Sequence, residues 1–278
     1  MVVDRSEIHE RLADRYPLAA MSDLFDVSGK TALVTGGSRG IGLMIARGLV
    51  QAGARVIVSS RKADDVQAAA QELAGLGDCI AIPGDISTAE GARELASATE
   101  AHFPELNILV NNAGAVWGAS LEEFPPVGWE KVLHTNVEGI FHLTVALLGA
   151  LRATADAADP ARVINIGSID GLRTPSVENY SYSASKAAVH MLTRHLAKRL
   201  APEHITVNAI APGPFESRMM AWALDDPESR AGIEQSVPLG RIGSPDDVAG
   251  LTLFLASRAG AYLTGTVIPL DGGITGCN

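Results

Sequence analysis

The run Thr31-Ala32-Leu33-Val34-Thr35 passes directly into Gly36-Gly37-Ser38-Arg39-Gly40-Ile41-Gly42. The first part is typical of a short buried strand, and the residues from Ile41 to Gly53 continue with the apolar spacing of a helix. Glycines let the backbone turn tightly and approach a pyrophosphate, and a helix N-terminus offers free N–H groups to the same anion. The spacing is Gly-x-x-x-Gly-x-Gly rather than the commoner Gly-x-Gly-x-x-Gly. It predicts a dinucleotide-binding turn, with tight strand-to-helix packing in the absence of a ligand as the alternative.

Outward from this turn, strand and helix patterns alternate along the chain. Such alternation predicts parallel β-α-β units joined by right-handed crossovers. The expected fold is α/β: a Rossmann-like doubly wound seven-stranded parallel sheet with helices on both faces. The expected strands are 31–35, 55–59, 79–83, 107–111, 162–166, 205–210 and 266–270, and the expected helices are 41–53, 63–75, 88–102, 127–151, 181–200 and 245–256.

The domain organisation follows from where this alternation stops. Residues 1–27 form an N-terminal extension whose apolar residues recur at helical spacing, so it is either a short packed helix or a partly ordered leader. Residues 28–278 are expected to form a single Rossmann-fold domain, because no composition shift marks a second one. The segment at about 212–238 is long and weakly periodic, which is typical of a substrate lid.

Composition excludes several classes of protein. Of the 278 residues 47% are apolar, which suits a sheet covered on both faces, and the net charge of −10 argues against a broad nucleic-acid surface. Two cysteines, Cys79 and Cys277, indicate no disulfide framework. We expect no membrane span, no signal peptide and a cytoplasmic location. We also expect no metal site, because the closest histidines, His190 and His195, do not share a helix face.

The pentapeptide Tyr182-Ser183-Ala184-Ser185-Lys186 carries the chemistry of the second half. Residues four apart lie on one face of a helix, so the spacing places a phenol beside an ammonium. A nearby cation favours the phenolate, which predicts a lowered pKa for Tyr182. Together with the glycine-rich turn, this pair predicts hydride transfer with tyrosine as the proton donor or acceptor.

The end of the second strand, Ser59-Ser60-Arg61-Lys62, predicts which dinucleotide is bound. NAD sites usually carry an acidic residue here for the ribose hydroxyls, and this chain has none. Instead it has two cations, with Arg39 in the glycine-rich turn. Guanidinium groups suit a phosphate dianion, so we expect NADPH over NADH. The alternative is that Arg61 and Lys62 are ordinary solvated charges.

Taken together, the motifs resemble the single-domain short-chain dehydrogenase/reductase family over about residues 29–274. Within that family the chain is most similar to NADPH-dependent 3-oxoacyl (β-ketoacyl) reductases of the rhamnolipid-pathway kind. The matching motifs are Thr35 to Gly42, Asn111-Asn112-Ala113-Gly114, Asn136, Ser168, Tyr182 with Lys186, Pro212-Gly213 and Leu270-Asp271-Gly272-Gly273.

The resemblance implies four catalytic residues. Tyr182 is the general acid in reduction, Lys186 lowers its pKa and binds the nicotinamide ribose, and Ser168 donates to the substrate oxygen. Asn136 holds a water that links Lys186 to solvent. Two hydroxyl donors aimed at the oxygen that gains charge make chemical sense. The alternatives are that Ser168 caps a turn and that Asn136 makes a buried hydrogen bond to the backbone.

The resemblance also implies the cofactor contacts for NADPH/NADP+. Asp85 and Ile86 flank the adenine, Asn112, Ala113 and Gly114 line the adenosine ribose, and Pro212, Gly213 and the Phe215 backbone meet the nicotinamide carboxamide. Ser217 stands where threonine is usual and keeps the hydroxyl. The full expected set is Gly36, Ser38, Arg39, Gly40, Ile41, Gly42, Ser60, Arg61, Lys62, Asp85, Ile86, Asn112, Ala113, Gly114, Tyr182, Lys186, Pro212, Gly213, Phe215 and Ser217.

The expected activity is NADPH-dependent reduction of a ketone to a secondary alcohol, with a 3-oxoacyl thioester as the first candidate substrate. An NAD(P)-dependent dehydrogenase of a steroid, polyol or sugar alcohol is the alternative enzyme, and a regulator that binds NADPH without turnover is the alternative from another class. The partners expected are a small carbonyl substrate and a homotetramer built through helices 127–151 and 181–200. The candidate pocket residues are Trp117, Asp170, Leu172, Pro175, Met219, Met220 and Trp222.

Overall fold

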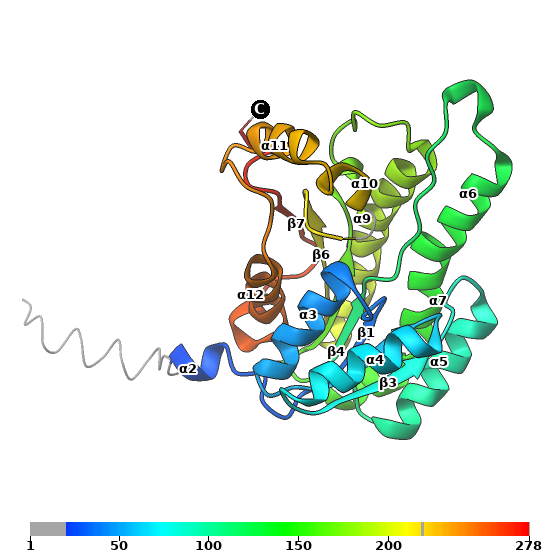
Figure 1. The fold of residues 1–278 in the computed structure, drawn as a ribbon. Helices are drawn as coiled ribbons and strands as arrows, with labels where there is room; N and C mark the ends of the chain where they lie inside the picture. Colours follow the sequence, from blue (N-terminus) through cyan, green and yellow to red (C-terminus); the bar gives the residue numbers. More distant parts are fainter. Residues whose placement is uncertain (1–20, 218–219, 278) are drawn as a thin grey trace, which may run out of the picture.

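The chain folds around one sheet of seven parallel strands in the order β3-β2-β1-β4-β5-β6-β7, in a computed structural model that describes residues 21–217 and 220–277 (Figure 1). The expected doubly wound α/β sheet is thereby confirmed. Every residue of the central strands β1, β4, β5 and β6 is buried, as expected for a parallel sheet covered on both faces. The strands are β1 (Thr31–Thr35), β2 (Arg55–Ser60), β3 (Cys79–Pro83), β4 (Ile108–Asn111), β5 (Ala161–Ile166), β6 (Ile205–Pro212) and β7 (Val267–Leu270).

Helices cover both faces of the sheet and divide the core into two layers (Figure 1). One layer packs α3 (Gly40–Gln51), α4 (Ala63–Ala74) and α12 (Pro245–Ala256) against the strands. The other layer is formed by the helices α5 (Ala89–His102), α7 (Gly139–Ala146), α8 (Leu148–Thr154) and α9 (Tyr180–Leu200).

The helix expected over 127–151 is not continuous. It consists of α6 (Pro126–Leu133), a π-helical turn (His134–Glu138), α7 and α8. Single π-helical turns inside helices are frequent at functional sites, and this one contains Asn136. The uniform apolar spacing hides the break, because a π turn adds one residue without changing the residue types.

The expected lid at about 212–238 is also not fully irregular. It contains α10 (Ala221–Leu224) and α11 (Pro227–Ser236). Asp226 caps α11 by accepting from the Ser229 backbone N–H at 2.8 Å, and Pro227 occupies the first helical position. The cap and the proline mark a helix start that the weak apolar periodicity did not reveal.

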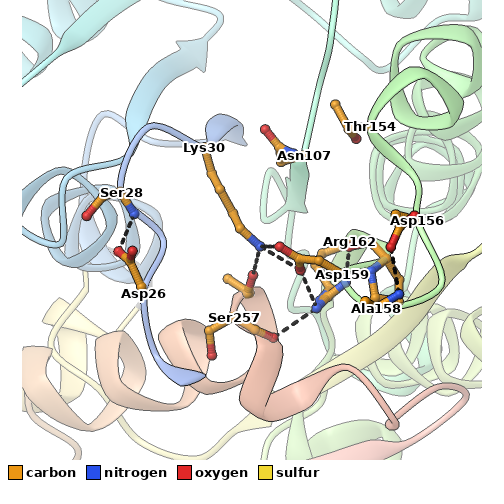
Figure 2. Close-up of polar contacts among 12 residues, drawn as sticks. Asp26, Ser28, Lys30, Asn107, Thr154, Asp156, Ala158, Asp159, Arg162 and Ser257 are labelled. Carbon is orange, nitrogen blue, oxygen red and sulfur yellow. Dashed lines mark hydrogen bonds and ion pairs between the residues drawn. The ribbon is translucent and has the colours of Figure 1, made fainter. Parts of the chain in front are cut away.

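A buried ionic cluster joins the layers at the edge of the sheet where β1 and β5 begin (Figure 2). Arg162, only 1% exposed, donates to the Leu255 and Ser257 carbonyls at 3.0 and 2.9 Å and to Asp159 at 3.1 Å. Lys30 donates to the same Asp159 carboxylate at 2.8 Å. The cations satisfy carbonyls at the C-terminal end of α12, so the cluster anchors this helix at the edge opposite the carboxyl ends of the strands.

The N-terminal extension is described only from α2 (Met21–Leu24) onward, so its expected helix over the preceding residues lies outside the described part. Among the described helices, no single one is long and apolar enough to cross a membrane; Pro126–Ala146 and Leu148–Thr154 meet the test only as a pair bent by 56°. No group of three or more His, Cys, Asp or Glu side chains in the described residues could hold a metal ion.

Candidate active site

The predicted site residues gather at the carboxyl ends of β1, β4, β5 and β6. The strand order reverses between β1 and β4, and ligands of open α/β sheets bind in the crevice outside such a reversal. The turn after β1 and the residues after β4 lie on either side of this point, because β1 pairs with β4. Fold and topology therefore place the glycine-rich turn where a dinucleotide is expected.

The geometry of the glycine-rich turn fits a pyrophosphate. Gly36 and Gly40 have φ of +63° and +53°, a region that L side chains rarely adopt. A Cβ on Gly42 would lie 2.3 Å from the Gly36 carbonyl oxygen, so this turn requires glycine. The helix α3 begins at Gly40, and its first N–H groups are free to bind an anion.

Thr35 and Asn112 lock this turn to the end of β4. The Thr35 hydroxyl accepts from the backbone N–H groups of Asn112 and Ala113, both at 3.0 Å. The Asn112 side-chain amide donates to the Thr35 and Gly36 carbonyls at 2.9 and 3.1 Å. The Asn112 side chain therefore shapes the turn itself. The sequence motif identified Asn112, but it did not reveal these partners or the part played by the Thr35 hydroxyl.

The cations expected to select the dinucleotide lie in the turn after β1 and directly after β2. Arg61 and Lys62 are exposed, and Ser60 Oγ donates to the Lys62 carbonyl at 3.4 Å. Arg39 lies 3.7 Å from the Asp65 carboxylate in the first turn of α4. Sequence reasoning missed Asp65, whose carboxylate lies close enough to Arg39 to offset part of its positive charge.

The other expected cofactor residues differ in what their side chains do. Asp85 accepts from the Ser87 N–H at 3.0 Å, so its carboxylate also closes its own turn. Ile86 and Phe215 are 4% and 2% exposed and belong to the two core layers, which leaves their backbones for any ligand contact. Ser217 lies against the turn, since a Cβ on Gly40 would be 3.2 Å from its Cβ.

Five further cofactor candidates also line this edge of the sheet, among them Gly114, where a Cβ would lie 3.4 Å from Asn136 Oδ1. Ser38 and Ile41 are half-buried in the turn and in the first turn of α3. Pro212 ends β6, and the Gly213 N–H donates to the Leu270 carbonyl at 2.9 Å. A Cβ on Gly213 would lie 2.8 Å from Asp271 Cβ, so the strand end also packs closely on the segment after β7.

The catalytic candidates Ser168, Tyr182 and Lys186 meet at the start of α9. Lys186 is 4% exposed; its Nζ lies 5.5 Å from the Tyr182 ring centroid and donates to the Ile166 carbonyl at 2.7 Å. Ser168, 7% exposed, follows β5 and hydrogen-bonds the Tyr182 side chain. The predicted phenol–ammonium pair thus exists, and the serine hydroxyl joins it.

The prediction that the pKa of Tyr182 is lowered is wrong, because the protein groups around the phenol raise it. Burial raises the pKa of Tyr182 to about 12, the Ser168 hydrogen bond lowers it less, and the Asp170 carboxylate raises it further. Lys186 lies over the ring and donates to a backbone carbonyl, so desolvation of the phenol dominates. Burial likewise lowers the pKa of Lys186 to about 8, against an increase from Asp170.

Asn136 makes the buried hydrogen bonds that were the alternative interpretation of its sequence position. It is fully buried, accepts from the Ala115 N–H at 2.7 Å, and donates to the Ala115 carbonyl and to Ser185 Oγ, both at 2.9 Å. Ser185 in turn donates to the Tyr182 carbonyl at 2.7 Å. The alternative of a buried backbone hydrogen bond is therefore confirmed. Through Ser185, Asn136 joins the π turn to α9, the helix that carries Tyr182 and Lys186. Its expected role in a water relay stays a prediction.

The candidate pocket residues are only partly described. Trp117 packs on Gly128 and lies under Lys131, whose Nζ is 5.3 Å from the indole ring. Leu172 is 42% exposed on the segment that follows Ser168. Asp170 accepts from Asn179 Nδ2 at 3.0 Å. Pro175 and Met220 are half-buried, whereas Met219 and the side chain of Trp222 lie outside the described residues.

This fold and site define a dinucleotide-dependent oxidoreductase, and comparison with known proteins agrees. A family model described as enoyl-(acyl carrier protein) reductase matches residues 36–275. The chain is 51% identical to a rhamnolipids biosynthesis 3-oxoacyl-[acyl-carrier-protein] reductase of Pseudomonas aeruginosa, over 91% of this chain and 99% of that one. It is 38% identical to a galactitol 2-dehydrogenase of Cereibacter sphaeroides, over 91% and 97%.

A solved structure extends this agreement to three dimensions. The Pseudomonas aeruginosa RhlG/NADP active-site complex superimposes with a TM-score of 0.89 at 51% identity, covering 91% of this chain and 99% of that one. The chain belongs to the short-chain dehydrogenase/reductase family. The family expected from the motifs is confirmed, as is the similarity to the rhamnolipid-pathway reductases.

Proposed function

We propose that this enzyme reduces the ketone of a 3-oxoacyl thioester to a secondary alcohol with NADPH as the hydride donor. The observation that carries the proposal is the grouping of Ser168, Tyr182 and Lys186 beside the glycine-rich turn, in a chain 51% identical to a 3-oxoacyl-acyl-carrier-protein reductase. The enzyme is an NADP(H)-dependent short-chain dehydrogenase/reductase, and the superimposed relative is a complex with NADP.

The site residues divide the reaction between them. NADPH, when bound, would supply a hydride to the carbonyl carbon and would itself be oxidised to NADP⁺. The Tyr182 phenol gives its proton to the carbonyl oxygen, and Ser168, hydrogen-bonded to Tyr182, donates to the same oxygen as negative charge develops on it. Because Tyr182 is protonated at neutral pH, the chain's own groups provide the acid that reduction requires.

A dehydrogenase of a polyol or sugar alcohol is the second candidate. The 38% identity with a galactitol 2-dehydrogenase favours it. Ser168, Tyr182 and Lys186 would catalyse that reaction in the reverse direction, with the Tyr182 phenolate as the base. An NADPH-binding regulator without turnover needs no Ser168, Tyr182 and Lys186 grouping, so the site does not favour it.

The proposal is tested by measuring how fast the absorbance of NADPH falls when the enzyme is given each of a panel of several ketones. The panel contains a 3-oxoacyl thioester, a steroid ketone and a ketose, each with NADPH. We expect the highest kcat/KM for the 3-oxoacyl thioester. A higher kcat/KM for the ketose or the steroid would contradict the substrate proposal, and tight NADPH binding without turnover of any ketone would favour the regulator.

We also propose a homotetramer built through α6, α7 and α9. Large apolar side chains are exposed on these helices: Val127 is 50% exposed, Phe141 42% and Met191 62%. Such a surface is typical of a contact between chains. Light scattering is expected to give four times the chain mass, and a monomer would contradict the proposal.

The proposed location is cytoplasmic. This location suits the two free thiols, Cys79 and Cys277, and cell fractionation tests it.

A further inference from the structure

Asp170 connects the two segments that carry the catalytic hydroxyl groups. Its backbone N–H donates to Ser168 Oγ at 3.1 Å, and its carboxylate accepts from Asn179 Nδ2 at 3.0 Å. Ser168 follows β5, and Asn179 is the residue before α9. One acidic residue therefore contacts the serine on one side and the start of the tyrosine helix on the other.

Asn179 continues the connection into the first turn of α9. It is 6% exposed, and its Oδ1 accepts from Ser183 Oγ at 3.1 Å. Its backbone carbonyl accepts from the Tyr182 N–H at 2.8 Å. Both ends of its side-chain amide are thus engaged, so the orientation of Asn179 is fixed by Asp170 and Ser183 together.

We propose that Asp170 is a positioning residue for the reduction: its backbone N–H holds Ser168 directly, its carboxylate holds the start of the Tyr182 helix through Asn179, and its negative charge faces the Tyr182–Lys186 pair. The inference rests on the proposed function and adds a residue to it. A misplacement of about 1 Å in such a site can cost about 100-fold in rate, so a fixed connection between the two segments has a direct kinetic consequence.

The charged groups around Asp170 set the direction of its electrostatic effect. It lies in the turn Ile169–Gly171, which packs against α9 and β6, and β6 carries no titratable side chain. From α9, Tyr182, Lys186 and His190 face this turn. Burial lowers the pKa of His190 to about 4, so it is neutral at physiological pH. On the same loop, Arg173 is exposed.

The carboxylate acts on the tyrosine and the lysine in the same sense. It raises the pKa of Lys186, which burial lowers to about 8, and it adds to the increase that burial causes at Tyr182. Asp170 therefore keeps protons on both groups. Reduction uses the protonated phenol and the ammonium, so it is expected to fail as pH rises through the pKa of Lys186. Removal of the carboxylate moves that alkaline limb to lower pH.

Two substitutions separate the two parts of the role. Asp170→Asn keeps an oxygen that can accept from Asn179 and removes the charge, whereas Asn179→Ala keeps the charge and removes the connection. We expect Asp170→Asn to move the alkaline limb of kcat/KM for reduction down by about one pH unit. We expect Asn179→Ala to leave the limb in place and to lower kcat by at least about tenfold, with KM for NADPH unchanged.

Glu178→Gln is the matched control, because it removes an exposed carboxylate one residue from Asn179 that binds the Tyr180 hydroxyl instead. It is expected to move neither readout. Nitrogen NMR of Lys186, assigned by its absence from Lys186→Met, follows the same titration without turnover. If the wild type reduces no ketone, the proposed function fails, and the NMR titration still decides on Asp170. A Lys186 titration at the same pH in wild type and Asp170→Asn would overturn the inference, as would an unchanged kcat in Asn179→Ala.

Discussion

Replacing Tyr182 with phenylalanine is expected to lower kcat for ketone reduction by about 10²–10⁴-fold, the range that positioned proton transfer contributes. In the proposed mechanism the phenol is the proton donor next to Ser168, and burial raises the pKa of Tyr182 to about 12. It therefore stays protonated through the neutral range. The substitution removes one hydroxyl from the ring, so the fold is expected to change little.

Tyr180→Phe is the control for this prediction, because Tyr180 lies on the same helix and loses the same hydroxyl. That hydroxyl donates to the exposed Glu178 at 2.7 Å and has no lysine one turn later. Initial rates at saturating NADPH, with the melting temperature of each protein, decide the comparison. A Tyr182→Phe enzyme as fast as the parent would remove tyrosine from the mechanism, and an equal loss in both variants would point to damage to the helix.

The raised pKa of Tyr182 also affects the two directions of the reaction differently. Oxidation of an alcohol requires the phenolate as base, and the chain's own groups keep Tyr182 protonated. Lys186 is the group that titrates nearer to neutrality, since burial lowers its pKa to about 8. In the site as folded the Tyr182 phenol therefore carries the proton that reduction needs, and the rate of oxidation is expected to increase as pH rises toward the pKa of Tyr182.

Most of the fold could be predicted from the sequence, because its strands are apolar runs bounded by turns. The helix α12 has the predicted bounds Pro245–Ala256, since Ser244 and Asp247 form a capping box ahead of a helix with proline in its first turn. The π turn around Asn136 could not be predicted. It depends on hydrogen bonds to Ala115 and Ser185, which lie far away in the sequence.

The sequence predicted which residues form the site better than it predicted their pKa values. The spacing of Tyr182 and Lys186 correctly placed the two side chains together, because it follows from helix geometry. The direction of the tyrosine pKa was wrong, since desolvation depends on everything packed around the phenol. Asp170 was expected only as a pocket residue. Its contact with Asn179 appears once β5 and α9 are placed against each other.

The cations at the end of β2 lead to the second large prediction. We expect replacement of Arg39 and Arg61 by glutamine to lower the preference for NADPH over NADH, measured as the ratio of kcat/KM, by about 100-fold. A hydrogen bond to a charged group contributes about 1.5–3 kcal/mol. Because both side chains are exposed, solvent screens the interaction, and we expect each arginine to contribute about tenfold to the cofactor preference. Activity with NADH is expected to stay within about twofold, because NADH lacks the phosphate that these groups would bind.

Arg55→Gln is the matched control. Arg55 is the first residue of β2, at the end opposite to Arg61, and it pairs with Asp78 at 2.9 Å. This control removes one positive charge, as each of the single substitutions at Arg39 and Arg61 does, so an unchanged cofactor ratio shows that location and not net charge matters. Asp65→Asn tests the local balance further: it removes the carboxylate 3.7 Å from Arg39 and is expected to raise the preference for NADPH. If the double variant kept the parent's preference, the selectivity would have to come from other groups, such as Ser60 and Lys62, and Arg39 and Arg61 would be ordinary surface charges.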